Sequence, residues 1–141
     1  MKILRIIGIL VFVIVGSWFC IVIEAKLLNL DLKINDPTTL PLAMWFMAII
    51  STLVFVAIGT SWLFTATQIT PGAKNGFFFG LFAVTLGFLL DIALLLPHKN
   101  GPSFLLKYYH QTIYWAAFVL VLLVCTAVGY IKARKIKKSL I

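Results

Sequence analysis

The sequence predicts an all-α fold: a polytopic membrane protein built as a single bundle of four transmembrane helices. Three observations support this prediction. The 141-residue chain is 62% hydrophobic and 11% charged, whereas soluble domains are about 45–50% apolar and about 25% charged. Four apolar runs are long enough to cross a hydrocarbon core, which takes about 20 residues. The basic residues gather at the ends of these runs, as they do in membrane proteins of fixed orientation.

The first span is predicted over residues 3–23 and contains a single charge, Arg5, near its start. The segment begins like a secretory signal peptide, and cleavage would leave three spans. However, its apolar run of about 18 residues exceeds the roughly 7–15 expected of a signal sequence. Trp18 and Phe19 also precede Cys20, where a lipoprotein cleavage site requires small residues. We therefore expect the segment to stay in place as a transmembrane helix.

The second and third spans are predicted over residues 40–66 and 76–96. Asp36 and Pro37 offer an N-cap and a first helical residue before the second span. Each span is expected to be helical, because the bilayer interior holds no water to bind free backbone groups. The segment 28–35 alternates strictly between apolar and polar residues. This pattern indicates either an extended segment on the headgroups or a strand paired with another segment.

The fourth span is predicted over residues 109–131, and Ser103 offers a cap for an earlier start. Aromatic residues near its outer end suit the membrane boundary; they are Tyr108, Tyr109, Tyr114 and Trp115. Directly after the span, the tail 132–138 packs five basic residues into seven positions. Such a tail anchors a span to anionic lipid headgroups, although its composition also suits a docking motif for a cytoplasmic partner.

The two sides of the predicted bundle differ in charge. The side with both termini has no acidic residue and eight basic ones, at Lys2, Arg5, Lys74, Lys132, Arg134, Lys135, Lys137 and Lys138. The other side has four lysines and all four acidic residues. Cytoplasmic segments are enriched in lysine and arginine, so we expect a multi-pass protein of the cell membrane, a bacterial cytoplasmic membrane, with both termini in the cytoplasm. The same placement argues against nucleic acid as a partner.

Small residues follow one face of the third span. Gly76, Gly80, Ala83 and Gly87 are spaced by three or four positions, which keeps them on one side of a helix. Lipid tails are as apolar as leucine, so membrane helices associate by close packing at small residues. We therefore expect another helix to cover this seam, and the next residue on the same face is Asp91.

Asp91 is expected roughly 7–8 Å below the outer end of its span, at about 1.5 Å of rise per residue. Glu24 and His110 fall at the outer ends of the first and fourth spans. The sequence therefore predicts a candidate polar cluster of Glu24, Asp91 and His110. An aspartate in mid-membrane costs about 2.5–3.5 kcal/mol, which makes it a candidate functional residue. The alternatives are a structural hydrogen-bonded cluster, or an Asp91 that reaches water at the membrane surface.

No catalytic, cofactor-binding or metal-binding motif is evident. Cys20 and Cys125 fall at different depths, so no disulfide is expected between them. His98 and His110 lack the spacing of a metal site. No cofactor is expected, and the sequence identifies no catalytic residue.

Three functions remain open. We expect first a small membrane protein that acts by association, as a homo-oligomer or as an accessory to a larger membrane protein, because the loops are short. The alternative is a small transporter or channel that uses the polar cluster around Asp91. The second alternative is a membrane enzyme acting on a lipid or quinone, with Asp91 and His110 as acid and base. A water-lined cavity reaching Asp91 from one side favours the transporter. A lateral opening to lipid beside Asp91 and His110 favours the enzyme, and a closed bundle that co-purifies with a larger partner favours association.

Overall fold

The computed structural model describes residues 2–27, 38, 41–67, 69–97 and 99–139, and in this part of the chain the fold is all-helical. Four of its helices are long and apolar enough to cross a membrane: α1 (Lys2–Leu27), α2 (Leu42–Ala66), α3 (Ala73–Leu95) and α5 (Thr112–Ser139). A short helix, α4 (Gly101–Tyr109), precedes α5. The predicted all-α class and the four long apolar helices are confirmed. The alternating segment 28–35 lies outside the described residues.

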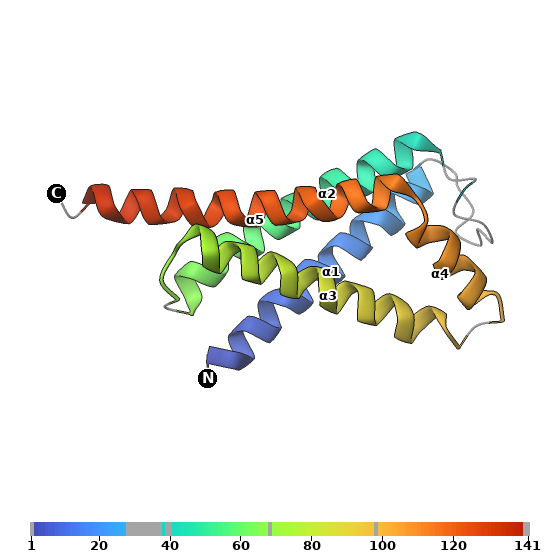
Figure 1. The fold of residues 1–141 in the computed structure, drawn as a ribbon, viewed down its shortest axis with the longest axis horizontal. Coiled ribbons are helices and arrows are strands. Elements are labelled where there is room, and N and C mark those ends of the chain that lie inside the picture. Colours follow the sequence, from blue (N-terminus) through green and yellow to red (C-terminus); the bar gives the residue numbers. More distant parts are fainter. Residues whose placement is uncertain (1, 28–37, 39–40, 68, 98, 140–141) are drawn as a thin grey trace.

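The chain termini and the α2–α3 connection lie at one end of the bundle, named here the terminal end, and α4 lies at the opposite, α4 end (Figure 1). α1 packs along α2, and α5 packs along both α2 and α3. α1 and α3 make little contact, and they diverge toward the α4 end (Figure 1). There α4 crosses from the end of α3 to the start of α5 (Figure 1).

The glycine seam of α3 lies against α5. A Cβ added at Gly76 would collide with the carbonyl oxygen of Cys125, and one added at Gly80 would come within 3.0 Å of the Cβ of the same cysteine. On the facing helix, a Cβ at Gly129 would collide with the backbone just before α3. The two backbones approach this closely because these positions carry no side chain, which is the mode of packing favoured where lipid removes the hydrophobic driving force.

An apolar core joins the long helices near their crossing point. Its most deeply buried side chains are Leu10, Val56, Thr60, Thr67 and Cys125. The hydroxyl of Thr60 donates to the carbonyl of Val56 at 2.7 Å and lies 3.2 Å from the Sγ of Cys125. Thr67 donates in the same way to the carbonyl of Leu63. These hydroxyls are satisfied within the preceding turn, so they need no partner from outside the core.

Arg5 joins the two helix ends at the terminal end of the bundle. Its guanidinium Nη1 donates to the carbonyl oxygen of Ala66 at 2.7 Å. Ala66 is the last residue of α2, where the carbonyls of a helix have no partner of their own and the helix dipole attracts a cation. The charge inside the first apolar run is therefore used to cap a neighbouring helix.

The largest difference from the prediction lies in the span expected over residues 109–131. Only α5 runs through this span, from Thr112, and α4 forms a separate helix before it, with Pro102 in its first turn. α4 stops at Tyr109, where the N–H of Gln111 closes a tight turn on the carbonyl of Tyr108 at 3.2 Å. α5 then continues through the basic tail. α4 has nine residues, which is too short for an apolar run of the length that predicts a transmembrane helix.

The α3–α5 contact predicts that Gly76→Leu will destabilise the fold, because a side chain has no space against the carbonyl of Cys125. We expect a loss of about 1–3 kcal/mol, the usual cost of overpacking, seen as a lower thermal unfolding midpoint in detergent by circular dichroism. Gly8→Leu is the matched control, because a Cβ at Gly8 would meet no atom within 4 Å. If Gly76→Leu unfolds at the wild-type temperature, the close contact is wrong.

Candidate functional site

A pocket of about 230 Å³ lies between the helices, from the middle of the bundle toward the α4 end. All five described helices contribute to its lining, which is mainly aliphatic and aromatic. Its polar groups come from Ser17, Thr52, Asp91, Tyr108 and Tyr114 and from the indole N–H groups of Trp18 and Trp45. The hydroxyl of Ser17 already donates to the carbonyl of Val13 at 2.7 Å within α1, so the free polar groups gather around Asp91.

The pocket exists because α3 leaves the other helices after its glycine contact. A Cβ added at Gly87 would meet no atom within 4 Å, although Gly87 continues the seam of Gly76 and Gly80. The side chains of Trp18 on α1 and Phe88 on α3 line the pocket and are also 52% and 39% exposed. The pocket therefore reaches the outer surface of the bundle between α1 and α3.

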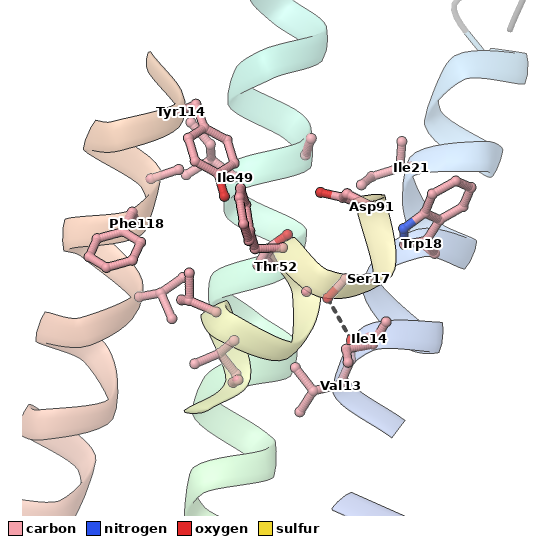
Figure 2. A pocket seen from close by; sticks show the side chains of 18 of the residues that line it. Val13, Ile14, Ser17, Trp18, Ile21, Ile49, Thr52, Asp91, Tyr114 and Phe118 are labelled. Atoms are coloured by element: carbon pink, nitrogen blue, oxygen red, sulfur yellow. Dashed lines mark hydrogen bonds between the residues drawn. The ribbon is translucent and has the colours of Figure 1, made fainter. Parts of the chain in front are cut away.

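Asp91 is the one carboxylate among the described residues that line the pocket. Figure 2 shows its side chain pointing from α3 into the pocket, with Trp18 of α1 on one side and Tyr114 and Phe118 of α5 on the other. The phenol of Tyr109 donates to its Oδ2 at 2.9 Å. No described lysine, arginine or histidine lines the pocket. The carboxylate thus has a neutral hydrogen-bond donor and no cation beside it within the described lining.

Three tyrosines surround Asp91 where α4 meets α5. The ring centroids of Tyr109 and Tyr114 lie 4.6 Å apart, edge to face, and Tyr108 lies 5.2 Å from Tyr114. Tyr108 also stacks on Trp45 of α2, with 5.4 Å between centroids. The rings therefore hold α4 against α2 and α5. Burial and, after it, the charge of Asp91 raise the pKa of both Tyr108 and Tyr109, so these phenols stay protonated at physiological pH.

The three residues of the predicted polar cluster lie at the α4 end, but in the described structure no hydrogen bond or ion pair joins them. Asp91 pairs with Tyr109. Glu24 on α1 accepts a hydrogen bond from the hydroxyl of Ser51 on α2, and its Oε2 is buried without a hydrogen-bond partner among the described residues. His110 is exposed at the end of α4. A shared role for Glu24, Asp91 and His110 stays a prediction.

Two hydrogen bonds in this region join residues whose pairing the sequence does not predict. Tyr109 was expected only as a boundary aromatic, and it reaches Asp91 because α4 folds back toward α3 after a separation of 18 residues. Ser51 was not expected to bind Glu24, because serines in membrane helices usually bond to the preceding turn. The sequence carries no signal for either contact, since both depend on how separate helices are arranged.

The other reactive side chains lie apart from the pocket lining. Cys20 is half-buried on α1, Cys125 is fully buried on α5, and both are free. Within the described ranges, no three histidine, cysteine, aspartate or glutamate side chains are placed to hold a metal ion. His98 lies outside those ranges.

No protein-family model, no curated protein and no solved structure matches this chain. The pocket is therefore interpreted from its own residues. It combines an apolar chamber, one carboxylate and phenol donors, a set typical of sites that bind a small molecule through burial and a few placed polar groups.

The Tyr109–Asp91 hydrogen bond predicts that Tyr109→Phe will lower stability by about 0.6 kcal/mol and by no more than about 1.7 kcal/mol, the average and the maximum measured for hydrogen bonds between membrane helices. The loss should appear in thermal unfolding, and it should shrink in an Asp91→Ala background because the acceptor is then already gone. Tyr130→Phe is the control, because that ring is exposed at the far end of α5 against Arg134. If the losses of stability caused by Tyr109→Phe and Asp91→Ala simply add in the double variant, the pairing is contradicted.

Proposed function

We propose that the protein crosses the cell membrane four times with both termini in the cytoplasm. Four long apolar helices support the crossing. Charge supports the direction, because Lys74 in the first turn of α3 and the basic tail of α5 belong to the terminal end, as do the chain termini (Figure 1). In this orientation the tail meets the anionic headgroups of the inner leaflet, and the pocket belongs to the outer leaflet.

We further propose that the pocket is the binding site of a small transporter for amphipathic molecules. The observation that carries this proposal is the single carboxylate of Asp91 in an otherwise apolar pocket that opens between α1 and α3. Acids inside membrane helices are costly and mark substrate or ion pathways. The volume of about 230 Å³ exceeds the roughly 150 Å³ of a cavity that holds benzene. It therefore suits a molecule with one ring or a short chain.

The glycine seam supports binding over the association that the sequence analysis placed first. Gly76 and Gly80 pack against α5 of the same chain, so this face is already covered and offers nothing to a second subunit. The bundle is also open between α1 and α3, whereas a closed bundle was expected of an accessory protein.

The pocket opens laterally between α1 and α3, as was expected of an enzyme, but its lining supports binding over catalysis. A general acid or base must lie within hydrogen-bond reach of the reacting atom. His110, the expected partner of Asp91 in an enzyme, is exposed at the end of α4 and does not line the pocket. The described lining also holds no cysteine, lysine or histidine, and the hydroxyl of its serine, Ser17, already donates to the carbonyl of Val13.

The proposed orientation predicts which ends of the chain an external reagent reaches. In a protein with Cys20→Ala and Cys125→Ser, we expect a membrane-impermeant thiol reagent to label Lys99→Cys on intact cells and to label Ser139→Cys only after the cells are opened. Both positions are exposed in the structure, so access depends on the membrane alone. Labelling of Ser139→Cys on intact cells would contradict the orientation.

The proposed binding site predicts saturable binding of a small amphipathic probe. We expect 4-bromobenzyl alcohol to quench the fluorescence of Trp18 and Trp45, which line the pocket, in protein held in lipid nanodiscs. Gly87→Leu fills the pocket from a position with open space and should abolish the saturable quenching. Gly8→Leu adds the same side chain away from the pocket and should bind as the wild type does. Equal quenching in the two variants would contradict the site.

A further inference from the structure

We infer that the molecule held in the pocket is an organic cation, an amine or quaternary ammonium group on a small apolar body. This inference rests on the proposed binding function and names the chemical class of its ligand. It depends on two features of the pocket: a carboxylate that lacks a cationic partner, and aromatic rings placed around it.

The charge in the pocket has one sign. Asp91 is the one residue of the described lining that is acidic or basic, and its Oδ2 accepts a hydrogen bond from the phenol of Tyr109 at 2.9 Å. Its other oxygen, Oδ1, accepts no hydrogen bond from the described residues, and the side chain points into the pocket (Figure 2). A carboxylate in an apolar site is best stabilised by an opposite charge. A cationic ligand supplies the charge that the lining does not.

Aromatic rings line the same part of the pocket. Those contributed by the four long helices and α4 are Trp18, Trp45, Phe88, Tyr108, Tyr114 and Phe118. Trp18 lies on one side of Asp91, and Tyr114 and Phe118 lie on the other (Figure 2). The faces of aromatic rings attract cations, and several rings around one site form the cage that recognises quaternary ammonium groups. Such a group needs no hydrogen-bond acceptor, which suits a lining with few of them.

Other classes of ligand fit the pocket less well. An anion would meet Asp91 without any lysine or arginine in the described lining. A zwitterionic phospholipid brings a phosphate next to its ammonium group, and the same lining has no cation for that phosphate. A bare metal ion requires several oxygen or nitrogen ligands, whereas this lining is mostly carbon. The organic monocation is the class that satisfies both the carboxylate and the rings.

The inference is tested with two probes of similar shape. One is (4-bromobenzyl)trimethylammonium, which carries a permanent charge, and the other is neutral 4-bromobenzyl alcohol. Both are titrated into nanodiscs holding the wild type, Asp91→Asn or Asp91→Glu, with tryptophan quenching as the readout and empty nanodiscs to correct for partition into lipid. Each probe is also compared between variants, because its partition into lipid is the same for all of them and therefore cancels.

We expect the cation to bind the wild type about tenfold more tightly than the alcohol, a difference of about 1.4 kcal/mol. Asp91→Asn should weaken binding of the cation about tenfold more than it weakens binding of the alcohol, which removes this preference, whereas Asp91→Glu should retain it. If the wild type binds both probes equally, or if Asp91→Asn weakens both equally, the ligand is not selected by charge and the inference is overturned. If neither probe quenches saturably, the binding site itself is wrong.

Should Asp91→Asn fail to fold, competition in the wild type decides the matter. The unbrominated benzyltrimethylammonium ion should displace the brominated alcohol at a concentration about tenfold lower than benzyl alcohol does, by the same ratio of affinities. Equal displacement by the two competitors would overturn the inference.

Discussion

At the terminal end of the bundle, the backbones of α3 and α5 touch through Gly76 and Gly129, with carbonyl groups where side chains would otherwise stand. In the proposed transmembrane arrangement the helices gain little from burying leucine, and direct backbone contact of this kind favours their association. Two straight helices that meet this closely at one end and cross at an angle must separate at the other. The divergence of α3 from its neighbours (Figure 1), and with it the pocket, follows from this contact.

The α4 end is held by a different interaction. α4 is short and crosses between two diverging helices. Its first residue, Gly101, is buried against the end of α3, where an added Cβ would collide with the carbonyl oxygen of Leu95. Stacking of Tyr108 on Trp45 and the hydrogen bond from Tyr109 to Asp91 attach it to α2 and α3. The groups that hold this end together are therefore the groups that surround the carboxylate. Structural support and candidate site share the same side chains, which gives Asp91 a defined position in an otherwise apolar pocket.

The sequence predicted much of the fold, because long apolar runs and small-residue spacing are local patterns that helices in lipid must obey. The positions of three of the long helices came out within a few residues, and the fourth was expected too early and too short. α4 was not predicted, because its nine residues contain no long apolar run. Of the candidate site, Asp91 was singled out by its place inside an apolar run, on the face that carries the small residues. Its contact with Tyr109, and that of Glu24 with Ser51, depends on how separate helices cross.

What the sequence by itself determined was the class of the protein: four long apolar helices, charges of one sign at the terminal end, and a carboxylate on the small-residue face of the third span. These features are local, because a segment of about 20 residues shows by its own composition whether it is apolar enough to cross a bilayer. Only the tertiary structure decided that the glycines face α5, that Gly87 faces empty space, and that tyrosines rather than His110 surround Asp91. Those outcomes depend on the angle at which helices cross, and that angle is set by contacts between residues far apart in the chain.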